Sequence, residues 1–269
     1  MAKYYTRACN FYYGKQAYTF IKKKKALPLC GNKHIAFDNL EIFSRDKKKI
    51  KSRLIHIKNI SKLKRKEKNK VKKDIKKIIS KRKNFLLNLD FSQPNIMGIL
   101  NMTPDSFSDG GKFNKGTKPF EHIAKMIKDG ASIIDIGGES TRPGSKTINQ
   151  NIEWMRLKKV LKNFKKKYKK TILSIDTRKS EIMLKSIYHG ADLINDVSGF
   201  DFDYEALGKI RKHKIAKVLH HMQGTPNTMQ LNPKYENVLL YIYDYFENSI
   251  KYKFKDKKII LDPGIGFGK

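Results

Sequence analysis

The sequence of 269 residues has little cysteine, no long apolar run and few acidic residues, and each shortage excludes a class of protein. Its two cysteines, Cys9 and Cys30, cannot build a disulfide framework, and no CxxC or Cys/His cluster near them indicates zinc. No apolar stretch approaches the roughly 18 to 20 residues that a membrane crossing needs. The apolar start at 11–21 is interrupted by Gly14 and Lys15, which argues against a secretory signal. We therefore expect a cytoplasmic protein without a membrane partner.

Acidic residues are outnumbered, with 25 Asp and Glu against 59 Lys and Arg, for a formal charge of +34. Residues 1–93 carry 28 basic and 6 acidic residues, so the chain divides by charge near Pro94. Such a surplus first suggests a polyanion as partner, because basic residues displace counterions from phosphates. Only 9 of the 59 are Arg, however, and a coding bias toward A and T would also produce abundant Lys. Nucleic acid is therefore not the partner we expect.

The two parts of the chain also differ in texture. Residues 4–59 alternate short apolar clusters with turns and predict short strands, and 61–84 predict a Lys-dense amphipathic helix. We treat 1–93 as a basic N-terminal extension of uncertain fold. The 39% of apolar residues provide for a sizeable core, which we place in a domain at 94–269.

From Pro94 onward, short apolar strands alternate with longer amphipathic helices, the pattern of a parallel α/β sheet or barrel. The predicted strands are 96–101, 133–137, 172–176, 193–197, 216–221 and 259–262. The predicted helices are 120–129, 152–168, 181–189, 204–213 and 235–252. Almost every strand ends in a polar, ionisable or glycine-rich turn. Six polar strand ends in succession favour a TIM-type (β/α)8 barrel, in which such ends meet at one mouth, over an open sheet.

Two of these turns have the composition of binding sites, one for a metal ion shared with phosphate and one for diphosphate. The first, Asn101 to Gly111 (NMTPDSFSDGG), offers an amide oxygen at its start that suits Mg²⁺ shared with phosphate, although it could be an ordinary turn. In the second, 137–144 (GGESTRPG), Arg142 stands beside hydroxyl groups as a clamp for diphosphate. No Walker A or GxGxxG pattern occurs, so nucleotide binding by those motifs is not expected.

Polar side chains also end three later strands: Asp176, Asn195 with Asp196, and Asp262. Buried carboxylates need partners, so several together indicate a ligand with matching donors, such as an amino-pyrimidinone ring. The alternative for each is helix capping after the strand. His220 and His221 could bind a metal or transfer protons, although such a pair more often splits between the core and a loop.

These turns, in this order, resemble the motifs of dihydropteroate synthases. The matching segments are NMTPDSFSDGG, GGESTRPG, SIDTRK (174–179), INDVSG (194–199), HMQGTP (221–226) and LDPGIGFGK (261–269). The resemblance covers residues 95–269 and implies a transferase of folate biosynthesis on a barrel fold. That enzyme joins 4-aminobenzoate to (7,8-dihydropterin-6-yl)methyl diphosphate and expels diphosphate.

The resemblance also implies roles for individual residues. Asn101 would hold Mg²⁺, and the pterin would bind Asp176, Asn195 and Asp262. Met222 would line the pterin pocket. Thr141 and Arg142 would lie near the diphosphate and 4-aminobenzoate. Asp105, Phe107 and Asp109 would sit on the first loop, where Asp105 and Asp109 act in catalysis with Arg142.

The chain matches only six of the family's eight β/α units. The region from Pro94 supplies 176 residues, whereas such a barrel needs about 250. We therefore expect a C-terminally truncated barrel that is unstable or inactive as written. Two alternatives stay open: a related pterin-dependent methyltransferase barrel, and a non-catalytic polyanion-binding protein in which residues 1–93 dominate. A homodimer also stays open.

Overall fold

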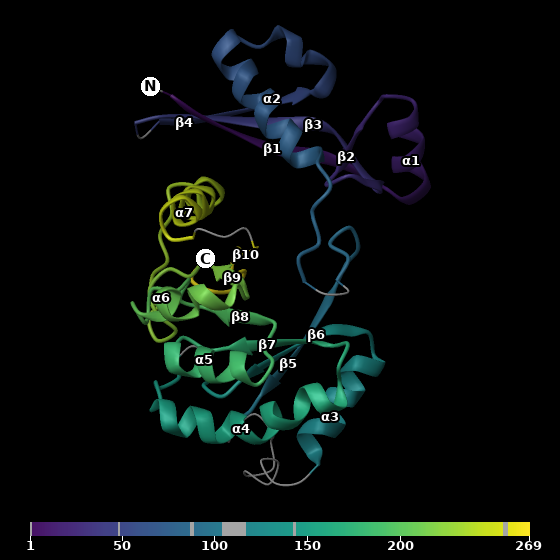
Figure 1. The fold of residues 1–269 in the computed structure, drawn as a ribbon. Coiled ribbons are helices and arrows are strands. Elements are labelled where there is room, and N and C mark those ends of the chain that lie inside the picture. The colour runs from purple at the N-terminus through teal and green to yellow at the C-terminus, as the bar shows by residue number, and fades with distance from the viewer. Residues whose placement is uncertain (1, 48, 87–88, 104–116, 142–143, 255–257) are drawn as a thin grey trace. The chain divides into compact units, whose positions relative to one another are not determined.

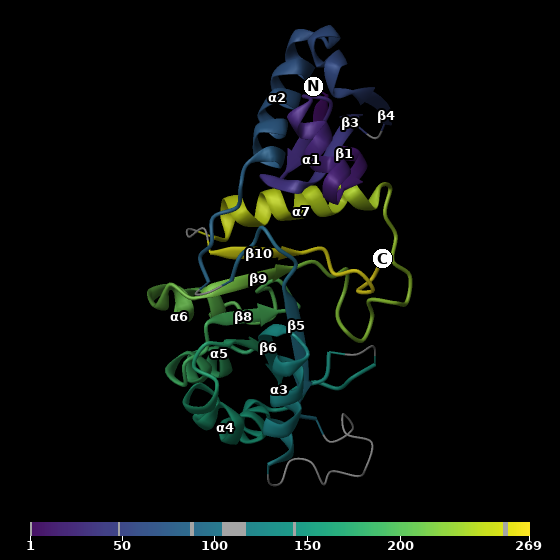
Figure 2. The same cartoon turned by 90° about the vertical axis from the view of Figure 1, so that its right-hand side faces the viewer.

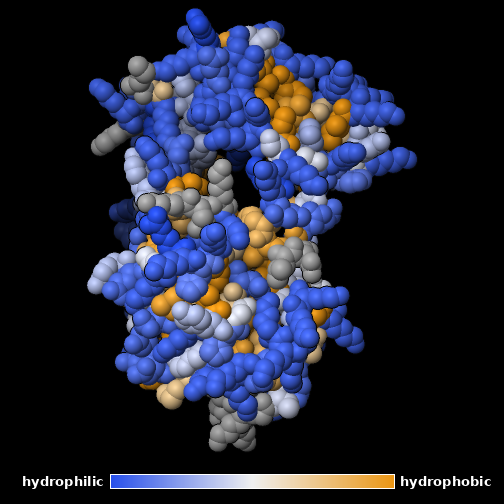
Figure 3. Space-filling view, in the orientation of Figure 1, coloured by the Kyte–Doolittle hydropathy of each residue, from blue (hydrophilic) through white to orange (hydrophobic). Residues whose placement is uncertain are grey.

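The computed structural model describes residues 2–47, 49–86, 89–103, 117–141, 144–254 and 258–269. The chain forms two compact units, and each is treated by itself. Unit 1 comprises residues 1–84 and 90–94, and unit 2 comprises 85–89 and 95–269. Within the described residues, no helix is long and apolar enough to cross a membrane. Figure 3 shows hydrophilic residues over most of the visible face of both units.

Unit 1 is an antiparallel sheet with two α-helices (Figure 1). Its elements are β1 (Lys3–Tyr13), α1 (Gly14–Lys22), β2 (Leu27–Leu29), β3 (Asn32–Asp46), β4 (Lys49–His56), a 3-10 helix (Ile57–Lys62) and α2 (Arg65–Ile79). Strand β3 lies in the centre, with β1 along one edge and β2 and β4 sharing the other. Val71 of α2 packs on Leu40 and Ile42 of β3, which gives the unit a core of its own.

The expectation of short strands and turns before residue 59 was wrong in two respects. Helix α1 was not expected, because it begins at Gly14 without a side-chain cap and offers only two turns of apolar spacing. Strand β3 runs for 15 residues, and its alternation is blurred where Ala36 and Phe37, next to each other, are both buried. The helix expected at 61–84 is confirmed as α2, which is shorter than predicted at both ends.

Unit 2 is a parallel sheet whose strands follow chain order, β5 to β10, with helices between them (Figure 2). The strands are β5 (Ile96–Asn101), β6 (Ala131–Gly137), β7 (Ile172–Asp176), β8 (Leu193–Asp196), β9 (Ala216–His220) and β10 (Ile259–Asp262). The helices are α3 (Lys118–Lys128), α4 (Gln150–Lys167), α5 (Ser180–Tyr188), α6 (Ala206–Ile210) and α7 (Val238–Tyr252). This confirms the predicted succession of β/α units, although the helix predicted at 204–213 is split into α6 and a 3-10 turn.

The two faces of this sheet differ in chemistry because side chains alternate along a strand. One face is apolar: Ile134 and Ile136 of β6 join a large core with Leu157 and Phe164 of α4. On the other face, β6 places Ile133, Asp135 and Gly137, so a carboxylate lies on the face turned away from that apolar core. Among the described residues, β5 and β10 are each paired on one side only, so the six strands form part of a barrel.

Candidate functional site

Three polar side chains lie side by side at the carboxyl ends of neighbouring strands. The register pairs Asn101 of β5 with Gly137 of β6, Gly137 with Asp176 of β7, and Asp176 with Asn195 of β8. Gly137 has no side chain, and its two neighbours lean across it. A Cβ built at Gly137 would lie 3.6 Å from Asn101 Oδ1 and 3.3 Å from Asp176 Oδ2. An amide oxygen and a carboxylate therefore approach each other at this point.

Several oxygens at this end of the sheet are buried without a hydrogen-bond partner in the described part of the chain. They include Oδ1 of Asp135, Oδ1 of Asp176 and Oδ1 of Asn195. A buried acceptor left unpaired costs about 1–3 kcal/mol, and most buried polar groups are paired for that reason. The strand ends are therefore suited to a ligand that brings N–H donors.

The raised pKa of Asp176 also favours a ligand that donates hydrogen bonds. Burial raises the pKa of Asp176 well above its ordinary value, and the charges of Asp135, Asp196 and Glu153 raise it further. Arg178 offsets only part of that rise. A ligand that donates hydrogen bonds to Asp176 would stabilise its ionised form. The carboxyl group thus gains most from a partner that is rich in donors.

Asp262 lies at the end of β10, opposite His220 of β9. Asn195 pairs with Val218 of β9, so Asp262 lies two residues further along the strand direction than Asn195. His220 Nε2 lies 4.0 Å from Asp262 Oδ2, and Asp262 Oδ1 accepts a hydrogen bond from the Gly264 amide at 2.8 Å. Its side chain is 46% exposed. Burial lowers the pKa of His220, and the nearby Asp262 partly opposes the change. Asp262 is thus available at the rim of the strand ends.

His220 and His221 are both buried, at 3% and 1% exposure, so the expected split between the core and a loop was wrong, although the two rings have different neighbours. His220 Nδ1–H donates to the Val197 carbonyl at 3.0 Å, whereas the His221 ring packs against Tyr245 with ring centres 4.9 Å apart. Burial lowers the pKa of His221 to about 4, and Lys269 and His220 contribute to the fall. In the described residues, no group of three or more His, Cys, Asp or Glu side chains is placed to hold a metal ion.

Asp196 and Asp262 do not cap a helix, which was the alternative for each strand-end residue, but each closes a turn. Asp196 and Asp262 each accept a hydrogen bond from the backbone N–H two residues further on, at Ser198 and Gly264. Asp176 does not cap α5, because the Ser180 amide at the start of that helix donates instead to Asp203. Asp176 and Asn195 therefore keep the ligand-binding interpretation.

The remaining predicted residues divide by whether the structure describes them. Thr141 and Met222 are half-buried, after β6 and β9 respectively. Four others lie outside the described residues: Asp105, Phe107, Asp109 and Arg142. The structure therefore carries no information on the roles predicted for those four.

A buried ion-pair network, which the sequence did not reveal, joins the turns after β6 and β7. Lys179 Nζ lies 2.5 Å from Glu139 Oε2 and 2.6 Å from Glu153 Oε2, and Arg178 also pairs with Glu139. The Ile148 amide donates to Glu139 at 2.9 Å, so the same carboxylate holds the far end of the connection that contains Thr141. Burial would raise the pKa of Glu139, but these hydrogen bonds outweigh it and the pKa lies below its ordinary value.

Asp135 was also missed, because it lies inside β6 and not at its end. It is 4% exposed, and its Oδ2 accepts a hydrogen bond from Asn195 Nδ2 at 2.9 Å. A signal was present in the sequence: a carboxylate interrupts the apolar run of β6 two residues before Gly137, which places both on the same face.

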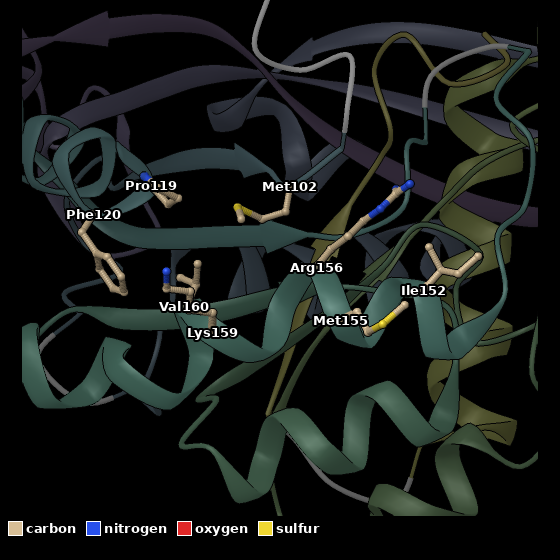
Figure 4. Close-up of a pocket in the computed structure, with 8 residues that line it drawn as sticks. All are labelled: Met102, Pro119, Phe120, Ile152, Met155, Arg156, Lys159 and Val160. Carbon is tan, nitrogen blue, oxygen red and sulfur yellow. The ribbon is translucent and has the colours of Figure 1, made fainter. Parts of the chain in front are cut away.

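A separate pocket of about 270 Å³ is lined by the first turn of α3 and the first three turns of α4 (Figure 4). Its lining is Met102, Pro119, Phe120, Ile152, Met155, Arg156, Lys159 and Val160. Arg156 also donates to the Gly138 carbonyl at 2.8 Å. Among the described residues, the lining side chains include two cations but no carboxylate or amide acceptor, so this part of the pocket does not suit an amino-pyrimidinone.

The comparison with known proteins indicates the same part of the chain as the strand-end acceptors. The family described as pterin binding enzyme matches residues 97–269, which include every strand end described above. The chain belongs to the pterin-binding enzyme family. Among its relatives, dihydropteroate synthase of Escherichia coli K12 is 42% identical over 185 residues, covering 67% of this chain and 65% of the relative.

Solved structures of family members agree in fold. Dihydropteroate synthase of Yersinia pestis, in complex with a sulfonamide drug, is 40% identical with a TM-score of 0.63, over 67% of this chain and 66% of that one. The enzyme of Clostridium difficile, solved in the presence of pteroic acid, is 38% identical with a TM-score of 0.58, over 65% of each chain. The chain thus spans just under two thirds of the length of these relatives.

Proposed function

We propose that this chain belongs to a dihydropteroate synthase of folate biosynthesis. The reaction joins 4-aminobenzoate to (7,8-dihydropterin-6-yl)methyl diphosphate, with loss of diphosphate. The observation that carries the proposal is the pair of buried, unpartnered acceptors on neighbouring strands, Asp176 Oδ1 and Asn195 Oδ1. A pterin ring offers an exocyclic amine and ring N–H groups along one edge, which are donors in the number and direction that these acceptors require.

In this proposal the pterin lies at the strand ends with its amino-pyrimidinone ring toward Asp176 and Asn195. Asp262, exposed at the rim and aligned with His220, would accept from a further N–H, and Met222 would cover an apolar part of the ring. Loss of diphosphate leaves positive charge on the pterin methylene, which the nearby carboxylates stabilise. The aniline nitrogen of 4-aminobenzoate then attacks that carbon and releases one proton to water, so no covalent enzyme intermediate is needed.

The diphosphate needs positive charge beside it, and we assign that role to Arg142 and to Mg²⁺. The hydroxyl of Thr141 would add a donor, and Asp105, Phe107 and Asp109 would approach 4-aminobenzoate from the first loop. Asn101 Oδ1, close to Asp176 Oδ2 across Gly137, fits Mg²⁺, which binds few protein oxygens and keeps water and phosphate ligands. When bound, the ion would neutralise charge on the leaving diphosphate.

The proposal is tested by measuring diphosphate release that requires both 4-aminobenzoate and the pterin diphosphate, with the product identified by its mass. Binding of 6-hydroxymethylpterin, followed by its fluorescence, is measured separately. If the chain binds neither the pterin diphosphate nor 6-hydroxymethylpterin, the proposal is contradicted. A chain that binds the pterin but releases no diphosphate keeps its place in the family and lacks the proposed activity.

Asn101→Ala separates the chemistry from folding. Removal of the amide oxygen should lower turnover at least about tenfold and raise the Mg²⁺ concentration required, because one ligand to the ion is lost. The unfolding midpoint should stay the same, since Asn101 lies at a strand end. Asn163→Ala is the control, because that exposed side chain only donates to the Lys159 carbonyl within α4. Unchanged kinetics in folded Asn101→Ala would remove Asn101 from the site.

A further inference from the structure

Asp135 lies beneath the row of acceptors, on the face of the sheet turned away from the apolar core. Alternation along β6 places it on the same face as Gly137, and the register puts Ile99 and Ser174 on either side of it. It is 4% exposed. Burial raises its pKa, and the polar side chains of Ser174 and Asn195 partly offset the rise. Burying a carboxyl group at this depth costs folding free energy, so its presence at this position needs a reason beyond packing.

A hydrogen bond of Asp135 reaches across a strand. Asn195 Nδ2, on β8, donates to Asp135 Oδ2, on β6, at 2.9 Å, while β7 lies between the two. The amide of Asn195 has two ends with opposite hydrogen-bond character. If it were reversed while Asp135 is ionised, Asn195 Oδ1 would face a carboxylate oxygen at the same distance, and two acceptors would repel each other. Asp135 therefore holds the nitrogen end of the amide, and Oδ1 is the end left unpartnered.

This orientation decides what the strand ends can recognise. With the amide held, Asn195 and Asp176 present oxygens from neighbouring positions on paired strands. Two neighbouring acceptors favour a ring edge with two donors and repel an edge with a carbonyl. If the amide could turn, Asn195 could offer its N–H₂ group instead, and a carbonyl at the same place on the ligand would be accepted.

We propose that Asp135 is a specificity-determining positioning residue, which fixes the Asn195 amide so that the site selects a 2-amino-4-oxopteridine over a 2,4-dioxopteridine. This inference rests on the proposed function, because it assumes that a pterin binds at these strand ends. It assigns Asp135 no contact with the ligand. Its effect is transmitted through Asn195 alone.

The experiment compares two fluorescent probes, 6-hydroxymethylpterin and lumazine, which carries a carbonyl where pterin carries the amine. Dissociation constants are measured for the wild type and for Asp135→Ala, Asp135→Leu and Asp135→Asn. The wild type should prefer the pterin, and the alanine and leucine variants should lose about tenfold or more of that preference, the worth of one hydrogen bond made or left unpaired. Leucine replaces the volume where alanine leaves a cavity.

Asp135→Asn is the matched control. Its amide oxygen can still accept from Asn195 Nδ2, so it should keep the preference within about threefold, the usual spread of a conservative replacement. The isosteric variant also keeps the test decisive if the other two do not fold. In an Asn195→Ala background, Asp135→Ala should have no further effect on the preference, because the two residues act through one contact.

The possible outcomes separate the inference from the function beneath it. A wild type that binds neither probe contradicts the proposed function. A wild type that prefers the pterin, with folded Asp135→Ala and Asp135→Leu showing the same preference, overturns the inference and leaves the proposed function standing. Loss of preference in Asp135→Asn would also overturn it, because charge and not the position of an acceptor would then be responsible.

Discussion

Asp196, a fully buried carboxyl group at the end of β8, makes the stability of the chain depend on pH. Its Oδ1 accepts hydrogen bonds from the Ser198 amide at 2.8 Å and the Ser198 hydroxyl at 2.6 Å, whereas Oδ2 has no described partner. Burial raises the pKa of Asp196 to about 6, and the Ser198 hydrogen bonds limit the rise. The folded protein therefore binds this proton more tightly than the unfolded chain does.

The sign of the effect follows from that difference. Between pH 4 and pH 6 or so, the folded state holds more protons at Asp196, so the free energy of unfolding falls as the pH rises, by up to about 3 kcal/mol. Asp196→Asn keeps the acceptor for Ser198 but does not titrate. Urea unfolding at pH 4.5 and pH 7 should show that the wild type loses stability relative to the variant as the pH rises. The lowered pKa of His221 makes the free energy of unfolding rise with pH. His221 is present in both the wild type and the variant, so its effect cancels in the comparison. A pH-independent difference would contradict the raised pKa.

At the scale of single residues, position along a strand decided what the sequence could reveal. Asp176 and Asn195 were predicted because polar residues at strand ends stand out against apolar strands. Asp135 was missed because its significance depends on a partner two strands away, which no local pattern contains. Lys179 was missed for the same reason, since both of its glutamates are distant in sequence.

At the scale of elements, the turns after β6 and β7 are held together by the buried pairs of Lys179. Lys179→Met would leave Glu139 and Glu153 without this cation, and breaking a buried pair in this way costs roughly 3–5 kcal/mol. We expect a loss of that order in the free energy of unfolding by urea. Lys209→Met is a matched control, because Lys209 also bridges two glutamates, Glu181 at 2.6 Å and Glu205 at 2.9 Å, but on the exposed surface of α5 and α6.

The control should change stability little, because water already screens exposed pairs. Equal losses in Lys179→Met and Lys209→Met would mean that burial of the network contributes nothing. The expected difference also has a consequence for the site. Glu139 fixes both ends of the connection after β6 through Arg178, Lys179 and the Ile148 amide, so that connection should become more susceptible to protease in Lys179→Met.

The elements of unit 2 were predictable, and those of unit 1 only in part, for one physical reason. In unit 2 each strand is short and mostly apolar and is covered on one face by helices, and each helix has a clear apolar stripe, so the two periods alternate distinctly. In unit 1 the long strands β1 and β3 mix buried and exposed positions irregularly. Helix α1 is too short for its periodicity to be decisive.

At the scale of the whole molecule, charge and site are separate. Residues 1–93 hold 28 of the 59 basic residues, yet every described residue of the candidate site lies in unit 2. The net charge, the most conspicuous number in the composition, therefore says little about the proposed function. Unit 2 should accordingly bind a pterin without unit 1.

The boundary between the units makes that prediction specific. Leu86 and Leu89 belong to unit 2 and are 4% and 3% exposed, and Leu89 lies beside Ala131 and Ile172 at the amino ends of β6 and β7, opposite the site. A fragment of residues 85–269 should bind 6-hydroxymethylpterin within about twofold of the full chain, because buried residues remote from a site add without coupling to it. A fragment of 95–269 lacks both leucines and should be less stable, by about 1.5–3 kcal/mol for each. Fluorescence titration and urea unfolding of the two fragments measure these effects, and a folded 85–269 fragment without pterin affinity would show that unit 1 contributes to the site.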